Sequence, residues 1–243
     1  MIAAAGVADS DNAGTVAFVV ATAFESRCVQ RGLKAVARAN AACIRCGIGC
    51  HRKDALLKLS RFQCIVSTGF AAGLQHSAAT GTLLIPGRIQ GIDGKFRNAS
   101  PEWHARIRDV LEGFQPLSSK PLIHVDEIVA TPGAKRALGA DGKLAGADME
   151  SALIADACEA QGIPFVTMRV VLDPVDATVP DAISAGAVNG TEPRALELLA
   201  ALARRPGDLH NAFIFAGYIM KARQILTQAI SQVTGALAAS AHT

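Results

Sequence analysis

Gly146-Ala-Asp-Met-Glu-Ser151 and Phe165-Val-Thr-Met-Arg-Val-Val-Leu-Asp173 are the stretches that decide the fold of this chain. A helix-length run, Met149–Gln161, lies between them and leads into the turn Gly162-Ile-Pro164, since glycine suits the left-handed residue that ends a helix. Residues 165–172 form an apolar run without alternation, which is typical of a strand covered on both faces. The two stretches therefore predict a loop, a helix, a tight turn and a buried strand.

Polar side chains stand at the ends of this unit, where chemistry usually occurs. Asp148 can cap the predicted helix, because its carboxylate can accept orphan backbone N–H groups. Asp173 follows the strand directly, and open α/β sheets bind ligands at the carboxyl ends of their strands. Met149 and Glu150 are expected to reach the same cleft. The sequence thus predicts a ligand site between the helix start and the strand end.

Strands and helices alternate along the rest of the chain. This pattern predicts an α/β fold, a three-layer α/β/α sandwich with a mixed central sheet. The segment from Cys28 to Cys43 is compatible with a helix, and a strand near Ala41–Arg45 is the alternative. Further strands are predicted at 16–20, 62–67, 80–86 and 122–125, helices at 52–60, 101–113, 132–138, 194–204 and 209–237, a loop or hairpin at 87–100, and a loop or lid at 174–193.

Composition limits the class of protein. Half of the 243 residues are hydrophobic, the formal net charge is +3, and the basic residues form no long runs, so a nucleic-acid surface is not expected. We predict one domain over residues 15–238, with a disordered tail at 1–14 and a frayed tail at 239–243. No signal-peptide pattern and no bilayer-length apolar stretch are present, which favours the cytoplasm.

The cysteines raise the question of a metal. Cys43, Cys46, Cys50 and His51 are closely spaced, but structural zinc sites normally take their ligands from two separated pairs, and the chain has no second Cys-x2-Cys pair. We therefore expect no metal, and free thiols packed around a glycine turn, Cys46-Gly-Ile-Gly49. Such a turn can also present backbone N–H groups to an anion.

These motifs together resemble the purine nucleoside phosphorylase and nucleosidase superfamily. The most specific part is Gly146–Ser151 followed by Gly162–Phe165 and Arg169–Asp173. Three further stretches agree in order and spacing, covering roughly Val16 to Asp173 in all: Ala21-Thr-Ala-Phe-Glu25, Cys46-Gly-Ile-Gly49 and the glycine-rich loop Ser67-Thr-Gly-Phe-Ala-Ala-Gly-Leu74. Within the superfamily the chain looks most like the hopanoid-associated phosphorylase subgroup, on account of Phe70, Asp173-Pro174-Val-Asp176 and Arg204-Arg-Pro206.

The resemblance implies cleavage of the N-glycosidic bond of an adenine nucleoside, with release of adenine. For the subgroup, the substrate is adenosylhopane, in hopanoid lipid biosynthesis. Arg169 lies inside the predicted strand and is expected to pair with an acid. The implied roles are proton donation to purine N7 by Asp173, orientation of an attacking water by Glu25, ribose binding by Met149 and Glu150, base contacts by Phe165 and the backbone of Val166, and glycine-loop contacts by Gly69, Phe70 and Ala71.

The attacking group is open between inorganic phosphate and water. Where phosphorylases of this superfamily bind phosphate with arginine and serine, this chain has Ser67 and Phe70, and Ala72 replaces a glycine. A phosphate buried without a cation would lack a charge partner, and Glu25 would repel it. The cations that another loop could supply are Arg27, Arg45, Arg52 and Lys53. No cofactor is expected, with inorganic phosphate as the alternative co-substrate.

Two other functions are compatible with the sequence. One is a 5′-methylthioadenosine/S-adenosylhomocysteine nucleosidase. The other is a non-catalytic nucleoside- or metal-binding module that uses residues 43–51. The expected partners are a small-molecule or lipid-linked adenine nucleoside and, by resemblance, further copies of the chain. A lipid-linked substrate needs an apolar mouth, for which Phe70 and Phe213–Ile219 are the candidates, and it would bring the protein into transient contact with a membrane surface.

Overall fold

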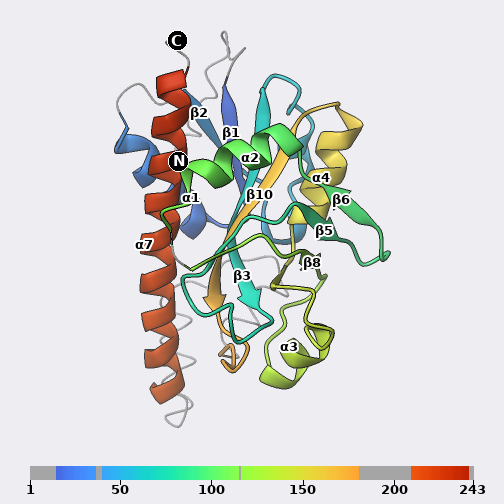
Figure 1. Ribbon diagram of the computed structural model, residues 1–243, viewed down its shortest axis with the longest axis vertical. Helices are drawn as coiled ribbons and strands as arrows, with labels where there is room; N and C mark the ends of the chain where they lie inside the picture. The colour runs from blue at the N-terminus through green and yellow to red at the C-terminus, as the bar shows by residue number, and fades with distance from the viewer. Residues whose placement is uncertain (1–14, 37–39, 115, 181–208, 241–243) are drawn as a thin grey trace, which may run out of the picture.

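The computed structural model of the chain describes residues 15–36, 40–114, 116–180 and 209–240. The predicted tail at 1–14, the predicted helix at 194–204 and most of the segment 174–193 lie outside these residues. Within the described ranges the chain builds one mixed sheet with helices on both faces (Figure 1).

The sheet has ten strands in the order β6-β5-β8-β9-β3-β10-β4-β7, and β1 and β2 extend it from β3. Strands β1, β2, β3 and β10 run parallel, whereas β4 lies antiparallel to β10 and β9 lies antiparallel to β3, which confirms the predicted mixed sheet. The strand bounds are β1 Val16–Val20, β2 Ala41–Arg45, β3 Cys64–Gly73, β4 Leu83–Leu84, β5 Arg88–Gln90, β6 Phe96–Asn98, β7 Leu117–Ser118, β8 Leu122–His124, β9 Gly146–Asp148 and β10 Phe165–Asp173.

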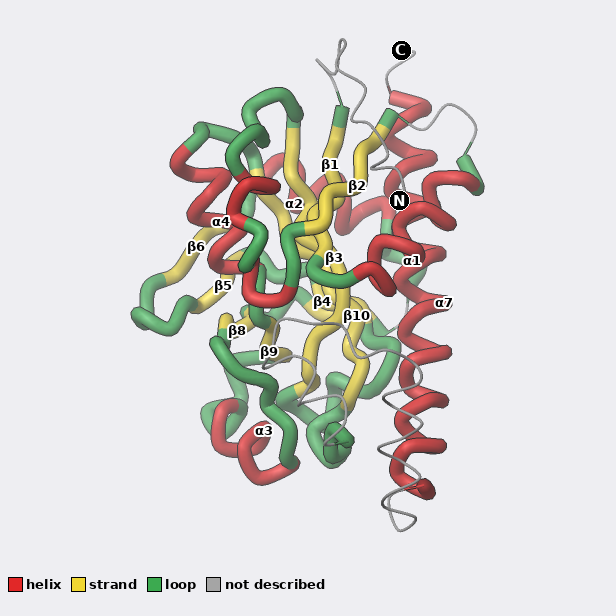
Figure 2. Tube along the Cα trace, turned by 180° about the vertical axis from the view of Figure 1, so that it is seen from behind, coloured by secondary structure: helices red, strands yellow, loops and turns green. Residues whose placement is uncertain are grey.

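Alternate residues of the central strands feed two separate cores, one on each face. On one face, Phe18 and Met168 pack with residues of α1 (Ala23–Lys34), α2 (Pro101–Val110) and α7 (Leu209–Ser240). On the other face, Val19 and Ile65 pack with α4 (Ser151–Ala160). Figure 2 shows α1 and α7 on one side of the sheet and α4 on the other. The result is the predicted three-layer α/β/α sandwich.

The deciding stretch folds largely as predicted, with β9 leading into α4 and then into β10, whose residues are buried except Leu172. The role of Asp148 differs in part. The helix begins at Ser151 with Glu150 at the cap position, and the Asp148 carboxylate, which accepts a hydrogen bond from the Ser151 N–H, is turned mainly toward Arg169. A buried arginine attracts a carboxylate more strongly than a helix terminus does.

The segment from Cys28 to Cys43 combines both alternatives, since α1 ends at Lys34 and β2 begins at Ala41. The helix predicted at 52–60 is wrong, because only two short 3-10 turns form, at Ile48–Cys50 and Lys53–Leu56. The side chain of Gln161 explains this difference. Its amide accepts from the Leu59 N–H and donates to the Leu56 carbonyl, so these groups are paired without a continued helix.

The helices predicted at 101–113, 132–138 and 209–237 are present, the first of them ending at Val110. A short helix, α3, spans Pro132–Leu138 and begins at the Thr131 cap, whose hydroxyl accepts from the Ala134 N–H. Helix α7 continues to Ser240, past the predicted end at 237, and lies along α1 and the sheet (Figure 1). None of the helices in the described ranges is both long enough and apolar enough to cross a membrane.

Candidate active site

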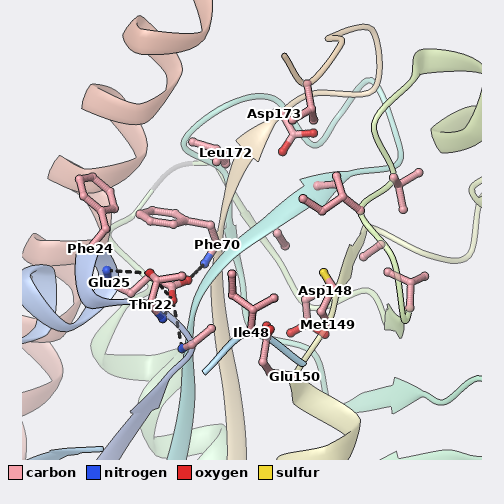
Figure 3. Close-up of a pocket in the computed structure, with 18 of the residues that line it drawn as sticks. Thr22, Phe24, Glu25, Ile48, Phe70, Asp148, Met149, Glu150, Leu172 and Asp173 are labelled. Atoms are coloured by element: carbon pink, nitrogen blue, oxygen red, sulfur yellow. Dashed lines mark hydrogen bonds between the residues drawn. The ribbon is translucent and has the colours of Figure 1, made fainter. Parts of the chain in front are cut away.

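Predicted site residues from several elements meet at one edge of the sheet. The parallel strands β1, β3 and β10 end on the same side, so Glu25 after β1 and Asp173 at the end of β10 come together with the last residues of β3. They line one cavity of about 650 Å³, together with the β9–α4 junction (Figure 3). The predicted residues that the structure brings into its lining are Glu25, Phe70, Ala71, Met149, Glu150 and Asp173.

Glu25 is fixed by its own helix terminus and by strand β3. It forms a capping box with Thr22, and its Oε2 accepts hydrogen bonds from the Ala21 and Thr22 N–H groups and from the Thr22 hydroxyl. Its Oε1 accepts one hydrogen bond, from the Phe70 N–H at 2.9 Å. A carboxylate oxygen has room for a second donor. Glu25 is therefore an oriented acceptor at the cavity wall, suited to holding a water molecule.

Gly69 lets Glu25 and Arg169 approach strand β3. Its φ is +148°, and a Cβ at this position would lie 2.1 Å from Glu25 Oε1 and 2.6 Å from Arg169 Nη1. Gly69 itself does not line the cavity. The predicted glycine-loop contact is thus indirect: the glycine makes room for Glu25 at the cavity wall and for Arg169 behind it.

Replacing Gly69 with alanine should therefore both destabilise the protein and displace Glu25. The strained backbone alone is expected to cost about 1–3 kcal/mol, measurable by urea unfolding. The matched variant Gly133→Ala, at a glycine where a Cβ meets nothing within 4 Å, should leave stability nearly unchanged. Equal stability of the two variants would contradict this account of Gly69.

Arg169 is a buried cation of β10 that contacts several polar side chains of the site. It is fully buried in β10, and its Nε lies 2.6 Å from Asp148 Oδ2. Its Nη2 donates to the hydroxyls of Ser67 and Ser151, at 2.9 and 3.2 Å. Burial opposes the charge, but the carboxylates of Asp148, Glu150 and Glu25 raise the pKa of Arg169 and keep it charged. An acid partner is predicted for Arg169, and in the structure this acid is Asp148.

Glu150 is buried at the start of α4, beside the Cys46–Gly49 turn. Its Oε1 accepts from the Gly49 N–H at 2.9 Å, so the glycine turn presents a backbone donor to this carboxyl group. Burial raises the pKa of Glu150 to about 8, and Arg169 opposes the rise. A carboxyl group that is partly desolvated in this way has unused hydrogen-bonding capacity for hydroxyl groups of a ligand.

Asp173 faces the cavity from the end of β10 with a partner that the sequence did not indicate. Its Oδ2 lies 2.5 Å from Lys135 Nζ, and the Lys135 side chain is fully buried. Burial raises the pKa of Asp173 to about 6, against the lowering effect of Lys135. The protonation of Asp173 therefore changes just below neutral pH, as a general acid requires.

Phe165 and Val166 are not part of this cavity, contrary to the predicted base contacts. Both are buried in the core at the beginning of β10, whereas Asp173 is at its end. A strand rises about 3.3 Å per residue, so Phe165 and Asp173 lie roughly 25 Å apart. One purine cannot contact both. The segment after β8 lines the cavity instead, through Val125, Glu127, Ile128 and Val129.

The lining divides into an acidic part and an apolar part. In Figure 3, Phe24, Phe70 and Leu172 lie toward α7, while Asp148, Met149 and Glu150 lie across the cavity from them. Phe215 and Ile219 of α7 add to the apolar part. Among the residues that the structure describes, the lining contains one cation, Arg27, and five carboxyl groups: Glu25, Glu127, Asp148, Glu150 and Asp173. Such a cavity suits a neutral or cationic polar group with an apolar extension.

The cysteine segment serves the local fold. The Cys46 thiol donates to the Val20 carbonyl, and Cys50 Sγ lies 3.6 Å from Cys46 Sγ. The His51 ring approaches the Ile48 carbonyl. Among the residues that the structure describes, no three or more His, Cys, Asp and Glu side chains are arranged to hold a metal ion. Ile48 of this turn contributes to the cavity lining.

Comparison with known proteins adds a family and a fold. Residues 26–205 match the model of the phosphorylase superfamily. No curated protein sequence matches the chain. Among solved structures, the 5′-methylthioadenosine/S-adenosylhomocysteine nucleosidase of Neisseria meningitidis in complex with methylthio-immucillin-A is similar, with a TM-score of 0.64, 16% identity, and coverage of 91% of this chain and 99% of that one. Futalosine hydrolase of Helicobacter pylori has a TM-score of 0.65, 15% identity, and coverage of 91% and 97%.

Proposed function

The chain belongs to the phosphorylase superfamily, and from this premise we propose that it hydrolyses the N-glycosidic bond of an adenine nucleoside with a bulky apolar 5′ substituent, adenosylhopane being the candidate. The observation that carries the proposal is the single cavity that joins Glu25, Glu150 and Asp173 beside an apolar wall. Met149 and Glu150 hold the ribose, and Asp173 protonates the purine as it departs. The reaction needs no cofactor.

Water is the proposed attacking group because the cavity offers an anion few charged donors. Among the described residues its lining contains one cation, Arg27, and the buried Arg169 behind the wall is already paired with Asp148. A phosphate dianion would need charge-assisted donors, such as bidentate arginines. Glu25 Oε1 instead offers an acceptor to a neutral water molecule. This supports hydrolysis over phosphorolysis, the two reactions that the motifs alone left open.

The apolar wall supports a bulky apolar 5′ group. Phe24, Phe70, Leu172, Phe215 and Ile219 lie together on one side of the lining, and pockets of 300–1,000 Å³ hold ligands of drug size. A lipid-linked nucleoside would bring the protein to a membrane surface at least transiently. Methylthioadenosine, with a small apolar 5′ group, is the second candidate, because a structurally similar nucleosidase is named for it.

A substitution at the apolar wall tests the substrate class. Changing Ile219 to glutamine should raise KM for adenosylhopane about tenfold, since losing the burial of roughly two methylene groups costs near 1.4 kcal/mol. The value of kcat should stay nearly unchanged, because this contact is made equally in the ground and transition states. Adenine release, followed by chromatography, is the measurement.

The neighbouring variant Met220→Gln is the control, as Met220 is 66% exposed and outside the lining. It should leave KM unchanged. If Ile219→Gln affects adenosylhopane and methylthioadenosine equally, the large apolar substituent does not occupy this wall. If the wild-type protein releases adenine from neither compound, the proposed function is wrong.

A further inference from the structure

Lys135 is a fully buried lysine that stands behind the proposed proton donor. It lies in the short helix α3, and its side chain has no exposed surface. Lys135 Nζ donates hydrogen bonds to the Pro174 carbonyl at 3.1 Å and to the Ala177 carbonyl at 2.7 Å, and it forms an ion pair with Asp173, whose Oδ2 lies 2.5 Å away. The contacts of its ammonium group therefore lie on Asp173 and the residues that follow it.

We propose that Lys135 is a positioning residue, whose ammonium group holds the Asp173 carboxylate at the cavity wall and neutralises the charge that Asp173 acquires when it protonates the leaving base. The inference rests on the proposed hydrolysis, for which it adds a residue outside the cavity lining. Lys135 does not touch the substrate and acts through Asp173.

The step balances as follows. The C1′–N9 bond breaks and its electron pair passes to the base, while the Asp173 carboxyl proton moves to the base. Asp173 is left as a carboxylate beside Lys135. The water oxygen bonds to C1′, and the proton it releases restores Asp173. A buried carboxylate without a cation would be costly, so Lys135 lowers the free energy of the state in which the base has left.

Lys135 also has a second, structural role. By holding the carbonyls of Pro174 and Ala177, it fixes the backbone that follows the end of β10. Separate exposed contacts hold the outer side of this loop, since Arg136 and His76 each form an ion pair with Asp176. The inner and outer contacts come from adjacent residues of α3, which offers a matched pair for experiment.

The charge on Asp173 depends on all groups that face it. Lys135 is the only one in direct contact within the described residues, and its loss should raise the pKa of Asp173, whose burial already acts in that direction. Within the described part of the chain, the other charged groups share the cavity or the surrounding loop without an ion pair to Asp173: Glu25, Arg27, Glu127, Asp148, Glu150, Arg136 and Asp176.

The test compares Lys135→Met and Lys135→Gln with the control Arg136→Met. Glutamine keeps donors for the two carbonyls but removes the charge. Since activity needs protonated Asp173, the alkaline limb of kcat/KM should begin near pH 6 in the wild type and in Arg136→Met. It should move to higher pH by about one unit in both Lys135 variants, with maximal kcat lowered about tenfold or more. A limb that stays at the wild-type pH in a folded Lys135 variant would overturn the proposal.

A second measurement does not depend on activity, so it separates failure of this inference from failure of the proposed function. The double variant Lys135→Met/Asp173→Asn removes both charges, and its urea midpoint should exceed that of Lys135→Met alone. A purely structural lysine would give the double variant the same or a lower midpoint, which would contradict the pairing even if Lys135→Met fails to fold.

Discussion

Asp173→Asn is expected to lower kcat about 10³-fold on any adenine nucleoside that the protein cleaves. Loss of a general acid typically costs 10²–10⁴-fold, and asparagine has nearly the same shape but no proton of suitable acidity. Asp173 is buried at the end of β10 and lines the cavity. Steady-state adenine release at pH 6 is the measurement, because the pKa of Asp173 is raised to about 6 by burial.

The control for this prediction is Asp176→Asn, three residues further along. Asp176 is half exposed and pairs with Arg136 and His76 at the surface. Its removal should change kcat by no more than about twofold, as is usual for exposed positions. An Asp173→Asn variant that keeps a tenth or more of the wild-type kcat would exclude Asp173 as the proton donor.

The largest effect on stability is expected from Arg169→Met. Removing one partner of a buried ion pair costs about 3–5 kcal/mol, because the remaining charge is left uncompensated. Here the loss is compounded, since Asp148, Glu150 and Glu25 all act on Arg169 and would repel one another without it. Urea unfolding gives the free energy, and the added variant Asp148→Asn should recover part of the loss.

The surface pair of Arg136 and Asp176, with side chains 58% and 53% exposed, provides the comparison. Arg136→Met should cost less than about 1 kcal/mol, as exposed pairs do. Similar costs for Arg169→Met and Arg136→Met would show that the buried network does not stabilise the site.

The sequence predicts the skeleton of this fold because its signals are local. The apolar run at 165–172 and the glycine at 162 mark a strand and a turn whatever packs around them, and the structure has both. Asp173 and Glu25 are found in the same way, since Asp173 ends the buried strand β10 and Glu25 lies in the first helical turn after the buried strand β1. Residues whose position depends on strand ends alone are therefore predictable, and the structure places both in one cavity.

Contacts between distant segments are not predictable in this way. A lysine in a seven-residue helix is ordinarily exposed, and only the tertiary structure shows that Lys135 donates to two carbonyls and pairs with a carboxylate some forty residues along the chain. The helix predicted at 52–60 does not form for the same reason, because the distant Gln161 side chain makes hydrogen bonds to the backbone groups of Leu56 and Leu59. The predicted base contacts of Phe165 and Val166 are wrong because these two residues begin β10 and Asp173 ends it, so the length of the strand separates them.

In the proposed reaction, water activated beside Glu25 cleaves an adenine nucleoside whose base Asp173 protonates. This hydrolysis is tested most directly by incubating the protein with adenosylhopane and with methylthioadenosine in phosphate-free buffer, then adding phosphate. We predict release of adenine and the free reducing sugar without phosphate, at a rate that phosphate does not increase. Adenine release that requires phosphate and yields a sugar 1-phosphate, or no release under either condition, would contradict the account.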